Sequence, residues 1–290
     1  MGACVGPGIT ESDDRNFAVV ASAIESTLDD AAFGSRPDRW PLPAAITPRQ
    51  LWLRAVAAGG QGRYGSAYSD LALLRRRVPA DRWSSLAHST HASFLRQLGW
   101  HTRARRWDGR ALALAGADPE AATDALVGLA ADALGVGRFA ASAALLSRAD
   151  TVVAAAQLPP QVADRLAVRR CWVGAELAMF SGDGRTAVGL AERGVELARA
   201  SGGASARHRV KSDVVLAAAL CSAGVIDKAR VIGEAAFDDA GRLGLIPLRW
   251  ALACLLIDTE SVTLPVNQLR EIRDICADQV WRAGGTWRPA

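Results

Sequence analysis

Two histidines three residues apart, His88 and His91, have the type and spacing that come closest to a metal site. On a helix this spacing places both imidazole rings on one face, and His101 follows just after the next predicted turn. Imidazoles placed in this way could bind zinc. No cysteine or carboxylate stands at ligand spacing, however, and both histidines fall where two helices would pack. The pattern favours packing, and we expect no bound metal.

Signatures of a nucleophile or of a phosphate-binding loop are missing from the sequence. The serines beside the histidines, such as Ser85 and Ser89, are not part of a G-x-S-x-G turn. The glycine-rich stretch 59–62 follows a predicted helix rather than a strand, so it marks a helix end and not a phosphate cradle. We therefore expect no enzyme activity and no cofactor.

The composition predicts that the histidines and serines discussed above lie on helices. Ala, Leu, Val and Arg fill the middle of the 290-residue chain, and 50% of it is hydrophobic, which indicates an all-α protein with a sizeable core. Lys211 and Lys228 are the only lysines, a bias typical of high-GC bacterial genes. The sequence has no run of about 18 apolar residues, and its five cysteines are far apart. These features predict a cytoplasmic protein.

The charge is unevenly distributed along the chain. The net charge is +4, but residues 1–39 hold seven carboxylates against three arginines. This segment therefore carries −4 and the remainder +8. A basic body could attract anionic partners, or its charges could pair with those of the acidic N-terminal helix. Charges that are simply solvated on the surface are the more common explanation of such a pattern.

One pattern recurs five times: an apolar helix that ends in a glycine, a short turn, and a second helix with a small residue five positions after the glycine. The glycines are Gly62, Gly99, Gly137, Gly182 and Gly224. The small residues are Ala67, Ala104, Ser142, Ala187 and Ala229. An alanine also stands seven positions before each glycine, at Ala55, Ala92, Ala130, Ala175 and Ala217. Glycine can end a helix in the left-handed conformation, and small residues let two helices approach closely.

The pattern resembles the tetratricopeptide repeat, whose first helix reads W-x2-L-G-x2-Y and whose second reads A-x3-F. The first copy is the most similar, with Leu51, Gly62, Tyr64 and Ala67. The resemblance covers roughly residues 48–244 and implies an α-solenoid of stacked antiparallel helix pairs in a right-handed superhelix. The chain departs from the family in its longer period, and in Asp108 and Gly233, which replace large apolar residues.

Three regions follow from this pattern. Residues 1–39 form an acidic amphipathic helix, expected at 11–31, and a linker. Residues 40–246 form the array of about five helix pairs. Residues 247–290 form capping helices, expected at about 248–258 and 265–283.

The resemblance also implies a concave groove lined by the first helices. Ten residues would form a partner-binding surface there: Arg49, Trp52, Arg96, Asp124, Arg169, Trp172, Glu176, Met179, Phe180 and Lys211. Tryptophan and arginine dominate binding hot spots, so a peptide with apolar and acidic residues is the expected ligand. The alternative is that Trp52 and Trp172 pack between repeats.

Two classes of function remain open at this point. The first is a regulatory protein-interaction scaffold that takes a segment of a partner protein in its groove. The second is a nucleic-acid-linked transcriptional regulator or regulator accessory domain with an arginine-rich surface. The arginines concerned are Arg75, Arg76, Arg77, Arg103, Arg105, Arg106 and Arg110. Neither function requires a membrane.

Overall fold

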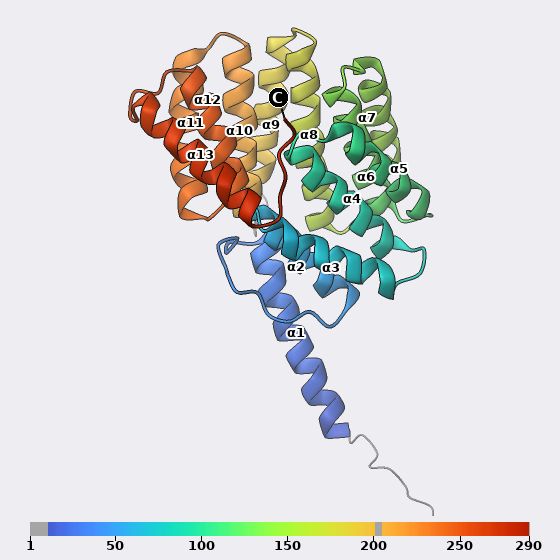
Figure 1. Ribbon diagram of the computed structural model, residues 1–290. Helices are drawn as coiled ribbons and strands as arrows, with labels where there is room; N and C mark the ends of the chain where they lie inside the picture. The colour runs from blue at the N-terminus through green and yellow to red at the C-terminus, as the bar shows by residue number, and fades with distance from the viewer. Residues whose placement is uncertain (1–10, 201–204, 290) are drawn as a thin grey trace, which may run out of the picture.

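A computed structural model describes residues 11–200 and 205–289, and within these ranges all regular structure is helical (Figure 1). The helices are α1 (Glu11–Phe33), α2 (Pro48–Gly60), α3 (Tyr64–Arg77), α4 (Arg82–Gln97), α5 (His101–Leu114), α6 (Pro119–Gly135), α7 (Phe139–Ala154), α8 (Pro160–Phe180), α9 (Gly184–Ala200), α10 (Ala206–Ser222), α11 (Ile226–Arg242), α12 (Ile246–Asp258) and α13 (Val266–Arg282). The prediction of an all-α repeat protein is confirmed.

From α2 onward, consecutive helices pack as pairs: α2 with α3, α4 with α5, α6 with α7, α8 with α9 and α10 with α11. These are the five expected copies, and α12 with α13 makes a sixth packed pair. The five turn glycines have φ between 75° and 86°, which is the left-handed region that favours glycine. The first helices of successive pairs contact one another from α2 through α12, and this contact stacks the pairs into an α-solenoid.

Several first helices begin at residues that satisfy their free amide groups. Thr47 forms a capping box with Gln50 at the start of α2, where Pro48 fills the first helical position. The side chain of Asp81 accepts a hydrogen bond from Ser84 N at the start of α4, and that of Asp118 accepts one from Ala121 N at the start of α6. Local sequence thus fixes where these helices start.

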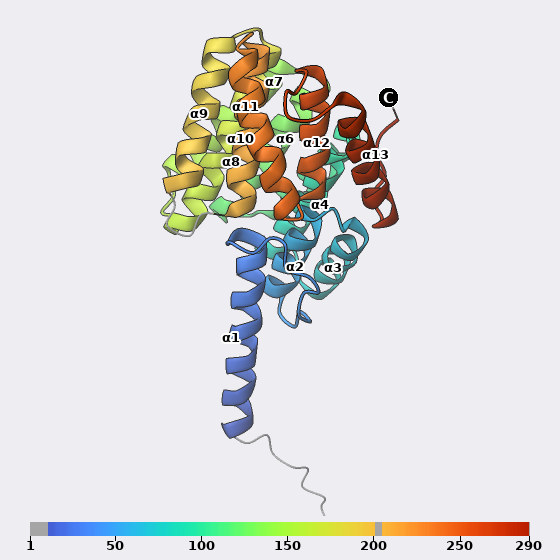
Figure 2. The ribbon, with the colours of Figure 1, turned by 90° about the vertical axis from the view of Figure 1, so that its left-hand side faces the viewer.

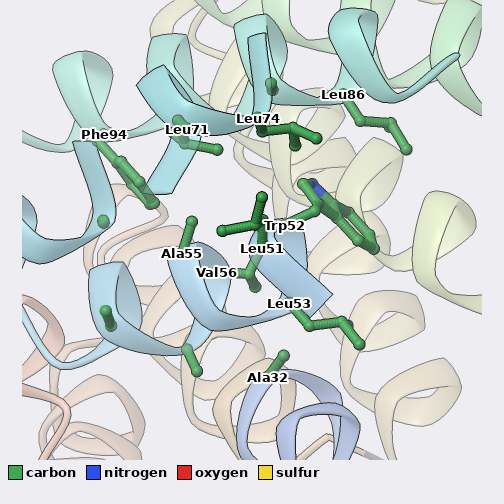
Figure 3. Close-up of a cluster of buried hydrophobic side chains, with 14 of the residues drawn as sticks. Ala32, Leu51, Trp52, Leu53, Ala55, Val56, Leu71, Leu74, Leu86 and Phe94 are labelled. Carbon is green, nitrogen blue, oxygen red and sulfur yellow. The ribbon is translucent and has the colours of Figure 1, made fainter. Parts of the chain in front are cut away.

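The recurring alanines lie where the helices cross. Ala55, Ala92, Ala130, Ala175 and Ala217 are all 0% exposed. The five small residues of the second helices are also 0% exposed. The register predicted for the repeats is therefore the register of the structure. Around Ala55, the side chains of Leu51, Leu71, Leu74 and Phe94 build the core of the first two pairs (Figure 3).

The two departures from the repeat pattern each have a structural reason. A Cβ atom on Gly233 would lie 3.2 Å from Cδ2 of Leu256, so the missing side chain lets α12 approach α11 closely. Asp108 is 0% exposed and forms an ion pair with Arg96 of the neighbouring helix α4. A buried ion pair takes the place of an apolar contact between α4 and α5.

The C-terminal end of the array returns to its beginning. After α13, Gly65 N donates a hydrogen bond of 2.7 Å to Ala283 O, and Arg288 N donates one of 2.9 Å to Leu98 O. The indole Nε1 of Trp100 donates to Thr286 O at 2.7 Å. Val280 of α13 belongs to the core built by α2, α3 and α4. The segment after α13 runs alongside α4 in Figure 1. The array is therefore closed rather than open at both ends.

Helix α1 extends away from the body (Figures 1 and 2). Val19 and Val20 are 69% and 54% exposed, whereas Leu28, Ala31 and Ala32 near the other end are at most 2% exposed. The C-terminal part of α1 contacts α2 and α10. Within the described residues, no helix has the length and apolar character needed to cross a bilayer.

Candidate functional site

Side chains from four helices meet on the inner side of the closed array. We call this group the central cluster. Its members are Phe33 of α1, Trp52 of α2, Arg165, Arg169 and Trp172 of α8, and Arg207 and His208 of α10. Helices α2, α8 and α10 are first helices of three different pairs. The resemblance predicts a groove lined by first helices, and three of the four helices that contribute to the cluster are first helices.

Phe33 lies at the middle of the central cluster. Its ring centroid is 5.4 Å from that of Trp52 and 6.0 Å from that of His208. The guanidinium carbons of Arg165 and Arg207 lie 5.7 Å and 5.9 Å from the ring of Phe33. At these distances a cation is attracted to the face of an aromatic ring. Phe33 thus connects α1 to residues of α2, α8 and α10.

The two tryptophans differ in exposure. Trp52 is 6% exposed, and its Nε1 donates a hydrogen bond of 2.9 Å to Thr90 Oγ1 of α4, so this ring packs between helices. Trp172 is partly buried, donates from Nε1 to Ser212 Oγ at 2.9 Å, and meets the ring of His208 edge-on. Of the two indoles, Trp172 keeps more surface available for a ligand.

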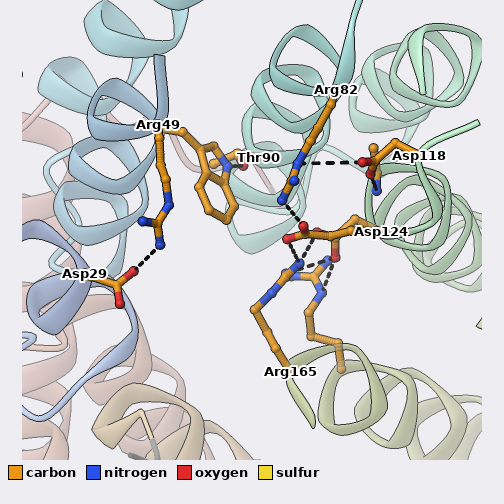
Figure 4. A network of polar contacts seen from close by, with 11 residues as sticks. Asp29, Arg49, Arg82, Thr90, Asp118, Asp124 and Arg165 are labelled. Carbon is orange, nitrogen blue, oxygen red and sulfur yellow. Dashed lines mark hydrogen bonds and ion pairs between the residues drawn. The ribbon is translucent and has the colours of Figure 1, made fainter. Parts of the chain in front are cut away.

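Arg165 forms the best-satisfied ion pairs of the cluster. Its Nη2 lies 2.8 Å from Glu120 and 2.8 Å from Asp124, both on α6 (Figure 4). Burial disfavours the charged guanidinium, but these two carboxylates nevertheless raise the pKa of Arg165. Glu120 is also paired with Arg82, so its charge is shared.

Arg169 and Arg207 are less well compensated. Nε of Arg169 lies 3.1 Å from Oδ1 of Asp124 but is not aligned for a hydrogen bond, and burial lowers the pKa of this arginine. Arg207 has no ion pair with a carboxylate of the described residues, and its Nε is buried without a hydrogen-bond partner there. Burial, together with the nearby charges of Arg169 and Arg165, lowers the pKa of Arg207 to about 10.

His208 is uncharged mainly because it is buried. Burial, followed by the charges of Arg207, Arg165 and Arg169, lowers the pKa of His208 well below its usual value. Three guanidinium groups thus lie close to this neutral imidazole.

The other predicted groove residues are distributed around the cluster. Arg96 forms ion pairs with Asp108 and with Asp132, the latter at 2.9 Å, and lies between α4, α5 and α6. Arg49 pairs with Glu25 and, at 3.1 Å, with Asp29, both on α1. Lys211 Nζ lies 3.6 Å from Glu176.

Met179 and Phe180 lie toward the end of α8. Met179 packs against the apolar core of α8, α9 and α10. Phe180 is 66% exposed, and its ring stacks with that of Phe139 at 6.2 Å. The structure thus brings Trp52, Asp124, Arg169 and Trp172 together, and it places Phe180 away from them.

The sequence pattern missed Phe33, Arg165, Arg207 and His208. Arg165 precedes Arg169 by four residues, so extending the same helix face by one turn would have included it. Arg207 and His208 likewise lie one turn before Lys211. Phe33 lay beyond the predicted end of the first helix at residue 31, and local sequence gave no signal for its position.

The residues first considered for metal chemistry lie elsewhere. The ring of His88 contacts Ser84 O through Nδ1 at 2.7 Å, and that of His91 stacks on Trp107. In the described ranges, no three His, Cys, Asp or Glu side chains are grouped as metal ligands require. Cys171 and Cys276 are buried, and Cys221 and Cys254 are partly buried; Cys4 lies outside the described residues.

No family profile matches the chain, and no curated protein matches its sequence. Among solved structures, a tetratricopeptide repeat protein from Parabacteroides merdae is similar, with 13% sequence identity and a TM-score of 0.44. The match covers 92% of this chain and 96% of that protein. The fold assignment depends on the helix pairs and their contacts described above.

Proposed function

We propose that this protein is a regulatory, cytoplasmic interaction scaffold whose central cluster binds an acidic and aromatic segment of a partner protein. The observation that carries the proposal is the excess of guanidinium groups. Arg165 and Arg169 pair with the carboxylates of Glu120 and Asp124, and Glu120 is shared with Arg82. Arg207, close enough to both arginines to feel their charge, has no carboxylate partner among the described residues. A partly buried cation without a counter-charge is costly, so a carboxylate from a partner would be bound favourably at Arg207.

The aromatic part of the ligand follows from the neighbours of these arginines. Trp172 presents a partly buried indole beside His208, and aromatic side chains pack well edge-to-face against such rings. A segment with an aromatic anchor next to an aspartate or glutamate would use both features. The alternation of charge and ring surface then provides specificity.

Peptide selection tests the proposal. Peptides selected from a random display library on the purified protein are expected to combine an aromatic residue with acidic ones. Arg207→Met and Trp172→Ala should each weaken their binding by about tenfold or more, since anchors of this kind typically contribute about 2 kcal/mol. Arg105→Met is the matched control, because Arg105 is exposed on α5 and takes part in no contact of the central cluster. Selected peptides that bind both cluster variants as tightly as the unaltered protein would contradict the proposal.

A second candidate function uses the outer surface of α3 and α5. Arg76, Arg77, Arg105, Arg106 and Arg110 are exposed, and no ion pair involves them within the described ranges. Arg103 stacks over the indole of Trp100 at 3.9 Å. Such a surface suits the phosphate backbone of a nucleic acid. Binding of duplex DNA that weakens steeply between about 50 and 200 mM salt would favour this alternative.

A further inference from the structure

The central cluster already holds a segment of the chain itself. Phe33 lies among Trp52, His208, Arg165 and Arg207. Its neighbour His208 also contacts Trp172, the indole at which the proposed function places the aromatic anchor of a partner. The main chain follows the side chain into the site, because Ala206 N at the start of α10 donates a hydrogen bond of 3.0 Å to Gly34 O. The end of α1 is thus docked between α2 and α10.

The docked segment has the chemistry that the site favours. Residues 28–33 read Leu-Asp-Asp-Ala-Ala-Phe, which combines two carboxylates with apolar side chains. Leu28 is 0% exposed, and Asp29 lies 3.1 Å from Arg49. The segment therefore resembles the ligand expected from the arginines and tryptophans of the cluster.

The docked segment nevertheless leaves Arg207 without a carboxylate partner. Asp29 is paired with Arg49, and Asp30 Oδ1 accepts hydrogen bonds from Ser35 N at 2.8 Å and from Ser35 Oγ at 3.2 Å. Neither carboxylate reaches Arg207, which contacts the ring of Phe33 instead. A partner segment that brings both a ring and a carboxylate would gain an ion pair that the internal segment lacks.

We infer that residues 28–33 are an internal ligand of the other members of the central cluster, those on α2, α8 and α10, and that a partner segment of similar chemistry binds by displacing residues 28–33. This inference depends on the proposed function, because it concerns the same site. Displacement requires that the end of α1 can leave. Most of the helix contacts of α1 are with α2, and the others of note are with α10. The first half of α1 extends away from the body (Figure 2). Release of this helix would expose Leu28, Ala31 and Ala32, but it would separate none of the helix pairs of the array.

The first experiment empties the site in the full-length protein. A fluorescein-labelled synthetic peptide of residues 24–36 is titrated into the unaltered protein and into Phe33→Ala. We expect the variant to bind the peptide about tenfold more tightly, because its own segment no longer competes. Val20→Ala, a substitution at an exposed position on the same helix, should bind like the unaltered protein. Phe33→Ala combined with Arg165→Met should bind weakly.

A second measurement uses the unaltered protein and does not depend on the folding of any variant. Amide hydrogen exchange is followed with and without an acidic, aromatic peptide selected by display. Displacement predicts faster exchange at residues 28–33 when the peptide is bound, although ligands normally slow exchange where they bind.

The outcomes separate the two proposals. Equal affinity of the labelled peptide for Phe33→Ala and the unaltered protein, or slower exchange at residues 28–33 with the selected peptide, would overturn the internal ligand. Failure of Arg207→Met and Trp172→Ala to affect the selected peptides would instead overturn the proposed function.

Discussion

The imidazole of His91 stacks on the indole of Trp107, with ring centroids 3.8 Å apart and planes inclined by 18°. The ring of Tyr68 also lies near the imidazole, with centroids 4.5 Å apart and planes inclined by 36°. Burial, aided by the charge of Arg75, lowers the pKa of His91 to about 3. In the unfolded chain the ordinary histidine value of about 6.5 is restored. The stack is therefore made by a neutral ring.

The lowered pKa of His91 predicts acid sensitivity. Below about pH 6.5 the unfolded chain binds a proton at this position that the folded protein does not bind, so the free energy of unfolding falls as the pH falls. We expect His91→Phe, which keeps an aromatic ring in the stack, to lose less stability than the unaltered protein between pH 7 and pH 4.5. Urea unfolding at several pH values measures this. Parallel pH curves for the two proteins would contradict it.

The pair Asp108 and Asp132 predicts a dependence of the opposite sign. Burial and the charge of Asp132 raise the pKa of Asp108 to about 7, against the effect of Arg96. Between about pH 4 and pH 7 the folded protein therefore holds a proton that the unfolded chain has lost, and the stability that this proton gives disappears as the pH rises through 7. Asp108→Asn should remove this decline. The test is the change in unfolding free energy from pH 5.5 to pH 8.5, which should be smaller in the variant.

Arg96 provides the matched comparison for that site. Replacing Arg96 with Met would leave two buried carboxylates without a cation, and breaking a buried pair in this way costs roughly 3–5 kcal/mol. The loss should be larger at pH 8.5 than at pH 5.5, because at the lower pH one carboxyl can be protonated. A loss of stability that is the same at both pH values would mean that neither Asp108 nor Asp132 takes up a proton at pH 5.5 in the variant.

The alanines at the helix crossings predict overpacking. Ala175→Leu and Ala217→Leu should each lower stability by roughly 1–3 kcal/mol, because both alanines are 0% exposed. Ala143→Leu on the exposed side of α7 should change stability by less than about 0.5 kcal/mol. Thermal unfolding of the three variants measures the difference. Similar melting temperatures would show that the crossings can accommodate a larger side chain.

The return of the C-terminal segment also predicts a measurable effect. The indole of Trp287 stacks on Trp250 at 4.1 Å and packs against the core of the first two pairs. Trp287→Ala should lower stability by roughly 1–3 kcal/mol and speed amide exchange near Leu98. Trp281→Ala is the control, since Trp281 is 67% exposed. Unchanged exchange at Leu98 would mean that the segment contributes nothing to closure.

The local features of this fold were predictable because they depend on neighbouring residues. The turn glycines and the alanine seven positions before each were enough to place the helix pairs, since they control helix ends and crossings. The closure of the array and the docking of Phe33 were not predictable in the same way. Both depend on the summed rotation from pair to pair, and the steps between glycines vary, with 45 residues from Gly137 to Gly182 against 37 from Gly62 to Gly99.

The hydrogen bond from Arg288 N to Leu98 O joins residues near the end of the chain to its first third. Open repeat arrays have only neighbour-to-neighbour contacts, so they can fold from any point and lose terminal repeats one at a time. A contact of such high sequence separation raises the contact order, which slows folding because a long loop must close first. The contact also couples the stabilities of the two ends of the array. Local unfolding at one end therefore removes contacts that stabilise the other end. We expect this chain to unfold in one cooperative step, unlike an open array of the same length.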